Sequence, residues 1–576
     1  MTGTGRAERT LLVLAAAAVG FAAADTYVVV LALPDMMTGV GLAIDELQRA
    51  APIVSGFLLG YVAVLPLIGR IADLRGRLPV LVGSLVVFAL GSLVTAAAFD
   101  LETMVAGRFL QGVGGGGLVP ATLALVADLY PPQRRGVPLG VVGAVQELGS
   151  VVGPLYGALV LAVSSWHAIF ALNLLVGVLL AVVIRRLGPH RPLDRLGALL
   201  ALLAAAALTL VMLEPPAIAR DVTWGLMFVP VTGDSRLLSP AGLALLVLVV
   251  LLAVRCVTAA SPLVDLRGWR RTAAEIDVLG AALLGLALSG VILAFATADP
   301  EVSVFSPAGP WLLAGSAVAA AGFVWRNRVS RHPLVPHRAL RATPAWGALV
   351  VSLFVGAALI AALVDIPIFA RITVYRDSQL LAALVLVRML VALPVGALLG
   401  GFLTRRVPAG LVTAVGMLLA AGGFVWMAQW GLTSLEHPVA TVPLVMAGLG
   451  FGLALAPVNA ALLAATDDAV HGVTSALLVV ARMVGMLVGI SALTTIGLRR
   501  YYAVQVDLPT PTEVCASGTQ CAEYTRLLKE AGLAQLQTVF WGAAVCAAVA
   551  AVVAVVTFRG AATRALSPGE TVRGAV

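Results

Sequence analysis

Charged residues are scarce in this chain. They make up 11% of its 576 residues, whereas soluble domains contain about 25%, so an ordinary soluble protein is excluded. The net charge of +8 does not indicate a nucleic-acid-binding protein, because the arginines are placed between long apolar runs. Their placement points to a membrane instead.

Cysteine and histidine are also few, with four and six residues respectively. No cysteine–histidine cluster has metal-ligand spacing, and no GxxxxGK[ST] loop is present to bind nucleotide phosphates. All six histidines lie at span ends or in loops. We therefore expect no enzyme activity, no cofactor and no metal, and any energy source is an ion gradient or a separate subunit. Cys515 and Cys521 share a long outer loop, where a disulfide is permitted.

Long apolar runs are abundant, since 60% of the residues are hydrophobic and the mean hydropathy is +1.03. A run of 18 or more such residues can cross a bilayer core of about 30 Å. The sequence predicts an all-α polytopic membrane protein with about sixteen spans. These lie near 11–33, 51–69, 78–98, 103–129, 137–163, 166–184, 194–213, 239–255, 276–297, 309–325, 344–370, 380–403, 408–430, 439–465, 471–498 and 537–558.

The basic residues set the orientation. Most of them fall in every second segment between spans, and the positive-inside rule places those segments in the cytoplasm. Both termini are then cytoplasmic, in a multi-pass protein of the plasma membrane. The apolar run after Arg6 and Arg9 continues past Asp25 to Leu33, which favours a retained first span over a cleaved signal peptide.

One stretch, Gly136 to Gly157, carries Glu147 near the middle of an apolar span. A carboxylate at bilayer depth costs roughly 2.5 kcal/mol or more, so its default interpretation is functional. Gly149, Gly153 and Gly157 allow another helix to approach closely, and Pro154 removes a backbone hydrogen bond where the helix can bend. The stretch indicates a moving part. The alternative is a structural polar pair between helices.

Other charges also lie within predicted spans. Asp25 is about nine residues from the outer end of the first span, and Arg108 in the fourth span is its expected partner. Arg388 is expected to pair with Glu147 or with a backbone carbonyl. Asp365 either lines an outer mouth or is interfacial.

A tight turn with the sequence GRIADLRGR follows the second span. The glycines are needed because the chain must reverse between two helices within a few residues. Asp73 is expected to lock onto a helix end or onto the other half of the protein. The predicted cytoplasmic gate comprises Gly69, Asp73, Arg75, Gly76 and Arg77.

GRIADLRGR, GRFLQGVGGG and GSVVGPLYG resemble the second-, fourth- and fifth-span motifs of the major facilitator superfamily, in the right order. DTYVVV, AVQELGSVVGPLYG and VVARMVGMLVG resemble the mycobacterial lipoprotein-coupled triacylglyceride exporters, also described as multidrug efflux pumps, within the drug:proton antiporter branch with linker helices. The turn departs from the pattern at Leu74, where arginine is usual, and at Leu78-Pro79, where a basic residue often stands. The resemblance implies two six-helix bundles, at 1–186 and 344–576, joined by a linker at 187–343.

Internal repeats support this division. Pro120, Glu147 and Gly149 run parallel to Pro457, Arg482 and Gly485, as expected of parallel repeats. Glu147 and Arg482 are thus pseudo-symmetric, opposite in charge and both near the midplane. In the linker, the hairpin that begins at Asp194 is repeated from Asp277, where the family usually has one hairpin. One of the two could instead lie on the surface.

The sequence favours a secondary transporter that exports an apolar or amphipathic compound in exchange for protons. Asp25 and Glu147 are the expected proton carriers, because burial favours the protonated carboxyl, and Arg482 and Arg108 are their expected partners. By resemblance the cargo is triacylglyceride or related lipid, the partner is a periplasmic lipoprotein reached by an outer extension at 499–536, and we expect a monomer. Two alternatives are a drug-efflux antiporter and a membrane scaffold without transport.

Overall fold

The chain folds almost entirely into helices. The computed structural model describes residues 4–42, 47–188, 194–232, 236–296, 306, 308–336, 339–375, 379–515, 521–561 and 563, and these contain no β-strand. Fourteen helices in this described part are long and apolar enough to cross a membrane. Two more helices, α5 and α12, occupy the two remaining predicted spans. The predicted all-α polytopic fold is confirmed.

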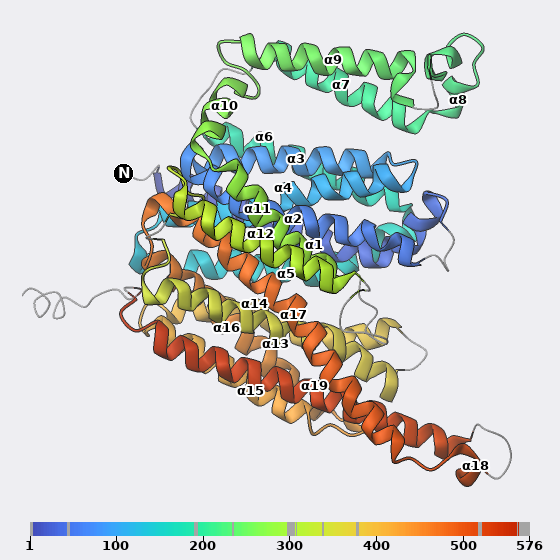
Figure 1. The fold of residues 1–576 in the computed structure, drawn as a ribbon, viewed down its shortest axis with the longest axis vertical. Helices are drawn as coiled ribbons and strands as arrows, with labels where there is room; N and C mark the ends of the chain where they lie inside the picture. The colour runs from blue at the N-terminus through green and yellow to red at the C-terminus, as the bar shows by residue number, and fades with distance from the viewer. Residues whose placement is uncertain are drawn as a thin grey trace, which may run out of the picture.

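The first third of the chain forms one bundle of six helices. They are α1 (Thr4–Gly39), α2 (Leu47–Arg75), α3 (Arg77–Ala96), α4 (Leu101–Leu129), α5 (Gly136–Val163) and α6 (Trp166–Leu187). Helix α1 packs on α5, and α4 packs between α2 and α3 (Figure 1). Asp100 fixes the start of α4, because its carboxylate accepts the Thr103 N–H in a capping box.

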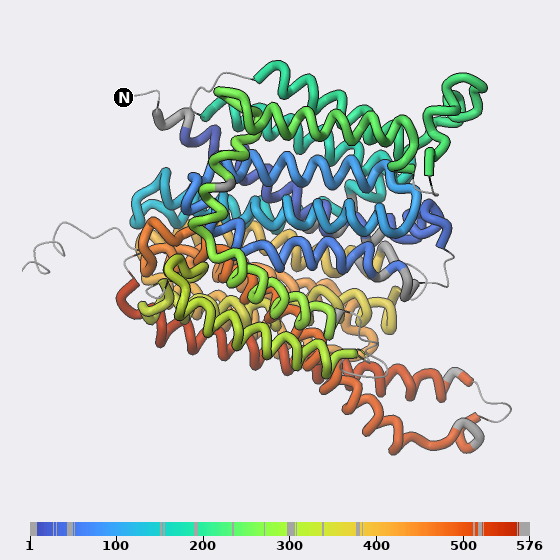
Figure 2. Tube along the Cα trace, turned by 45° about the horizontal axis from the view of Figure 1, so that its top comes forward, coloured from blue at the N-terminus to red at the C-terminus, as the bar shows by residue number. Residues whose placement is uncertain are grey.

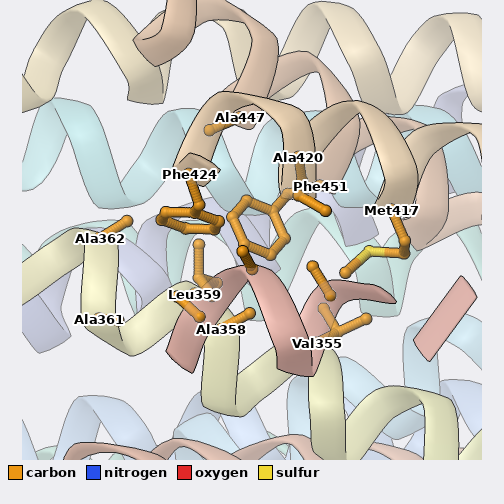
Figure 3. Close-up of a cluster of buried hydrophobic side chains, with 14 of the residues drawn as sticks. Val355, Ala358, Leu359, Ala361, Ala362, Met417, Ala420, Phe424, Ala447 and Phe451 are labelled. Atoms are coloured by element: carbon orange, nitrogen blue, oxygen red, sulfur yellow. The ribbon is translucent and has the colours of Figure 1, made fainter. Parts of the chain in front are cut away.

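The last part of the chain forms a second bundle. Its long helices are α13 (Thr343–Thr373), α14 (Gln379–Leu403), α15 (Ala409–Met427), α16 (Thr441–Ala464), α17 (His471–Val506) and α19 (Ala522–Thr557). Its core is apolar and closely packed (Figure 3). Phe424 and Phe451 meet edge to face with their ring centroids 5.9 Å apart, against Leu359 and small alanine side chains. Alanine at these positions lets the helices approach closely.

Two helical hairpins of the same design connect the bundles. The first consists of α7 (Arg195–Leu213) and α9 (Pro240–Thr258), and the second of α11 (Val278–Ala296) and α12 (Gly309–Val329). Asp194 caps α7 and pairs with Arg255 at 2.9 Å, and Asp277 caps α11 and pairs with Arg326 at 3.0 Å. Each carboxylate therefore ties the two helices of its hairpin together at one end. The sequence repeat is a repeat of structure.

The two hairpins nevertheless have different surroundings. Helix α11 packs against α2 and α17, where the two bundles meet, whereas α7 and α9 pack mainly on each other. Figure 1 shows α7 and α9 at one edge of the molecule, running alongside the bundle helices. A short helix, α10 (Leu266–Glu275), connects the hairpins. The duplication thus provides one hairpin where the two bundles meet and one at the periphery of the molecule.

The two ends of the bundle differ. The end where α1 begins and α2 ends, which we call the arginine-rich side, carries Arg75, Arg135, Arg186 and Arg405. At the opposite side α17 and α19 extend beyond the other helices (Figure 2). Near the tip of this projection lies α18 (Pro511–Val514), and a disulfide joins Cys515 to Cys521.

Candidate functional site

A small cavity lies between the two bundles near the middle of the molecule. Its walls come from α4 and α5 of the first bundle and from α13, α16 and α17 of the second, and its volume is about 40 Å³. This space holds a few water molecules at most and is far smaller than an acyl glyceride. Glu147, Arg482, Gln146, Asn459 and Ser352 provide its polar lining.

Glu147 and Arg482 face each other across this cavity. Arg482 Nη1 lies 3.9 Å from Glu147 Oε1, and each side chain keeps 12% of its surface exposed. Glu147 belongs to α5 and Arg482 to α17, so the ion pair connects the two bundles. A pair at this distance beside a cavity is held loosely, and separation of the bundles would break it.

The glycines of the α5 motif pack α5 against its own bundle. A Cβ atom at Gly149 would collide with the Gly20 carbonyl on α1, and one at Gly153 with the Ala24 carbonyl. Gly157 likewise faces Val28. The side chain of Pro154 lies outside the described residues. These contacts fix Glu147 relative to α1 within the first bundle.

A second acid–arginine pair is enclosed within the first bundle. Arg108 Nη1 donates to Asp25 Oδ2 at 2.9 Å, and the two side chains are at most 1% exposed. Asn173 of α6 also donates to Asp25, and Gln111 accepts from Arg108 at 2.8 Å. The guanidinium carbon lies 4.5 Å from the Phe57 ring centroid. This network joins α1, α4 and α6.

The turn between α2 and α3 holds the bundles together on the arginine-rich side. Asp73 accepts the backbone N–H groups of Gly472 at 2.8 Å and Val473 at 3.0 Å, at the beginning of α17. Arg77 lies 3.2 Å from Asp73 and donates to the Asp468 carbonyl at 2.6 Å. Asp73 therefore locks onto both a helix end and the other half. We call these contacts the latch.

Two glycines make this turn possible. Gly76 has a φ of 92°, a conformation that side chains rarely adopt, and it separates α2 from α3 by one residue. Gly69 lies where α2 approaches α17, and a Cβ atom there would come within 2.5 Å of the Gly472 carbonyl oxygen. The turn is thus built for close contact between the bundles.

Arg75 does not join the latch directly. Its Nη2 donates to Asp265 Oδ2 at 2.7 Å, and its guanidinium carbon lies 5.0 Å from the Trp269 ring centroid. Both partners belong to the linker, Asp265 as the cap of α10 and Trp269 within it. The sequence placed Arg75 in the gate and gave no sign of this contact.

The predicted partner of Arg388 was wrong. Arg388 Nη1 donates to Thr441 Oγ1 at 3.1 Å, and Arg482 faces Glu147 in its place. Asp365 is 6% exposed within α13 and is not part of the cavity wall. Position within a span did not reveal which helix face each residue occupies.

Several residues of these networks were missed. Asn173, Gln146 and Asn459 are polar residues inside apolar spans, which is a signal that the sequence does carry. Arg135 was missed as a contact between bundles. It donates to the Leu463 carbonyl at 3.4 Å and lies 3.7 Å from Asp468.

Comparisons with known proteins agree with this architecture. A model of the Major Facilitator Superfamily matches residues 15–329. A triacylglyceride transporter of Mycolicibacterium hassiacum is 37% identical over 511 residues, covering 86% of this chain and 81% of that protein. A triacylglyceride transporter of Mycobacterium tuberculosis is 34% identical over 519 residues, covering 87% of this chain and 85% of that protein.

Solved structures show the same fold at low identity. The proton:xylose symporter XylE has a TM-score of 0.52 at 12% identity, with 95% of each chain covered. The human organic anion transporter MFSD10 has a TM-score of 0.53 at 14% identity, covering 94% of this chain and 99% of that chain. Because the family model matches more than half of the chain and relatives above 30% identity span most of it, this protein belongs to the major facilitator superfamily and is a multi-pass membrane transporter.

Proposed function

We propose that this transporter exports a triacylglyceride-like lipid across the plasma membrane in exchange for protons, by alternating access between its two bundles. The arginine-rich side faces the cytoplasm, with both termini there. The observation that carries the proposal is the loose Glu147–Arg482 pair, which joins the bundles across a cavity. The names of the relatives support the lipid cargo.

The proposed cycle begins from the conformation described here. The latch closes the arginine-rich side through Asp73 and the beginning of α17. A proton from the opposite side binds the Glu147 carboxylate and removes its charge. Arg482 then loses its partner, and the bundles can rearrange so that the latch opens and the proton leaves to the cytoplasm. When Glu147 is charged again, its pairing with Arg482 favours the return of the bundles to the conformation described here.

Asp25 has a different part in this proposal. Its carboxylate is held by Arg108 and Asn173 inside one bundle, so motion between bundles does not separate it from its partners. We propose Asp25 as a second proton site whose charge changes only when Arg108 moves. Its main effect is to keep α1, α4 and α6 in place.

The small cavity constrains the lipid route. A glyceride cannot fit into 40 Å³, so the cargo enters only when the bundles separate, from the leaflet between them. On the opposite side, the projection of α17 and α19 is the proposed surface that passes lipid to a periplasmic lipoprotein. We propose that the transporter binds this lipoprotein as a monomer. A cationic lipophilic drug is the second candidate cargo, because Glu147 places a carboxylate in the cavity wall.

The test is export from proteoliposomes that contain the full-length protein, with and without a proton gradient. A labelled triacylglyceride and a fluorescent cationic dye are followed for wild type, Glu147→Gln and Glu102→Gln. Glu102 is an exposed acid in the first turn of α4 and provides the matched control.

We expect gradient-driven lipid export in wild type and in the control, and its loss in Glu147→Gln. Export of dye alone would assign the protein to drug efflux. Lipid movement that is the same without the gradient and in Glu147→Gln would refute proton coupling. Absence of any lipid or dye movement would favour a membrane scaffold.

A further inference from the structure

Helix α10 is held at the membrane surface by its connections. The span α9 ends at Thr258 and the span α11 begins at Val278, both on the arginine-rich side, so the connection that contains α10 lies on that side. Asp265 starts the helix by accepting the Gly268 N–H at 2.8 Å. A helix in this position meets lipid headgroups on whichever face the protein does not cover.

The residues of α10 divide into three faces at 3.6 residues per turn. Gly268 and Thr272 face the protein, and Thr272 is buried. Leu266 and Trp269 form an apolar face that remains partly exposed. The third face carries Arg267 and Arg271, one turn apart.

The arginine face has no ion-pair partner in the part of the chain that the structure describes. Arg267 and Arg271 are both exposed, and neither has an ion pair within the described residues. Two like charges four residues apart destabilise a helix unless an anion lies near them. Arginine on an amphipathic surface helix, beside a tryptophan at headgroup depth, is the pattern that attracts anionic lipid.

Helix α10 also contacts Arg75 at the turn between α2 and α3. Arg75, at the end of α2, lies between Asp265 and the Trp269 ring. Gly268 allows this approach, because a Cβ atom there would collide with the Arg75 guanidinium. Arg75 Nη1 is buried without a hydrogen-bond partner within the described residues. Arg75 is two residues from both Asp73 and Arg77 of the latch.

We propose that α10 binds the phosphate headgroup of an anionic phospholipid in the leaflet on the arginine-rich side, through Arg267 and Arg271, and that this lipid steadies the latch through Arg75. The bound headgroup fixes α10 on the membrane, α10 fixes Arg75, and Arg75 fixes the turn that carries Asp73. Anionic lipid then favours the conformation that is closed on this side. The proposal concerns regulation by lipid and does not depend on the identity of the cargo.

The binding test uses the full-length protein in nanodiscs of phosphatidylcholine with a rising fraction of phosphatidylglycerol. Trp269 reports contact through quenching by brominated phosphatidylglycerol, and subtraction of a Trp269→Phe variant removes the signal of the other tryptophans. The variant is Arg267→Gln with Arg271→Gln. Its control is Arg405→Gln with Arg406→Gln, two exposed arginines at the end of α14 on the same side.

Each arginine near the surface contributes roughly fivefold to the affinity for anionic lipid. We therefore expect the α10 double variant to weaken the apparent affinity for phosphatidylglycerol at Trp269 roughly twentyfold, and the control to leave it within about twofold. Equal loss in both double variants would show general surface attraction only. Displacement of the quencher by millimolar inorganic phosphate would show a free-anion site. Either result overturns the proposal.

The coupling test measures the distance between the bundles on the arginine-rich side. Spin labels are placed at Arg186→Cys and Arg559→Cys, which are exposed at the ends of α6 and α19, with Cys256 and Cys546 replaced by serine. We expect phosphatidylglycerol to increase the short-distance population in wild type and not in the α10 double variant.

A second variant separates binding from coupling. Gly268→Ala keeps both arginines but places a Cβ atom against Arg75 and against the Asp265 carboxylate that holds it, so we expect it to bind phosphatidylglycerol but to lose the distance response. A Gly268→Ala protein that responds like wild type would overturn transmission through Arg75. None of these measurements requires transport, so a failed export assay and a failed lipid effect remain distinguishable.

Discussion

Two acid–arginine pairs at membrane depth show how differently the same chemistry can be used. Asp25 and Arg108 lie 2.9 Å apart inside one bundle, almost fully buried, with Asn173 and Gln111 completing their hydrogen bonds. Glu147 and Arg482 lie 3.9 Å apart in different bundles, beside a cavity. The first pair is enclosed on every side, whereas the second depends on how the bundles sit.

Because of this difference, breaking the two pairs should lower the free energy of unfolding by different amounts. Removing one member of a fully buried pair leaves an uncompensated charge, which costs about 3–5 kcal/mol. The Glu147–Arg482 pair is longer and borders a cavity with room for a few water molecules, so removing one of its members should cost less. The enclosed pair therefore belongs to the stability of a bundle, and the open pair to the equilibrium between conformations.

The largest predicted effect is on stability. Asp25→Ala should destabilise the folded protein by about 3–5 kcal/mol, because Arg108 remains buried without its partner. Glu147→Ala should cost less than Asp25→Ala, because the cavity beside Arg482 has room for a few water molecules near its remaining charge. Thermal unfolding in detergent measures both. Equal losses for the two variants would remove the distinction between the pairs.

The second-largest predicted effect is on transport, when the charges of Glu147 and Arg482 are changed and then exchanged. Arg482→Glu alone should lower gradient-driven transport at least tenfold, about 1.4 kcal/mol, because it places two carboxylates across the cavity. Adding Glu147→Arg should recover transport by restoring an ion pair between the bundles. The same exchange of Asp25 and Arg108 should not recover it, since Asn173 and Phe57 suit only the native order. Recovery in both exchanges would contradict this account.

A smaller effect concerns contact between the bundles. Gly69→Ala should disfavour the latched conformation by about 1 kcal/mol, because its Cβ atom would press on the Gly472 carbonyl oxygen. Gly83→Ala is the control, because nothing lies within 4 Å of a Cβ atom at that position. The labels at residues 186 and 559 should report a longer distance for Gly69→Ala only.

The smallest effect is expected at Arg388. Arg388→Gln removes the part-buried hydrogen bond to Thr441 and should reduce transport by no more than about fivefold, since one such hydrogen bond contributes roughly 1 kcal/mol. Proteoliposome export at matched protein amounts is the measurement. A loss of transport as large as that of Glu147→Gln would show that Arg388 takes part in proton coupling.

The sequence predicted the helical fold because length and hydropathy are local properties. Apolar runs of 18 or more residues favour helices that span the bilayer, since a helix satisfies its backbone hydrogen bonds within its own segment. The pairing of Asp25 with Arg108 could also be expected, because unpaired charges at that depth are costly. Repetition within the chain suggested that Glu147 and Arg482 are related.

The partners of Arg75 and Arg388 could not be predicted in the same way. Both depend on which face of a helix meets which neighbour, and in lipid that choice rests on close packing between small residues. Arg75 could have faced the latch or the linker, and it faces the linker, where Gly268 leaves room for its guanidinium. The two hairpins make the same point, because similar sequences occupy the seam in one case and the periphery in the other.

By itself the sequence determined that this is a membrane protein with many spans, a strongly asymmetric charge distribution and a few buried charges. Hydropathy and the cost of burying charge act on each segment separately, so they can be read along the chain. Only the tertiary structure decided which buried charge is enclosed and which one bridges the bundles. That distinction comes from the relative placement of helices far apart in the chain, which no local property specifies.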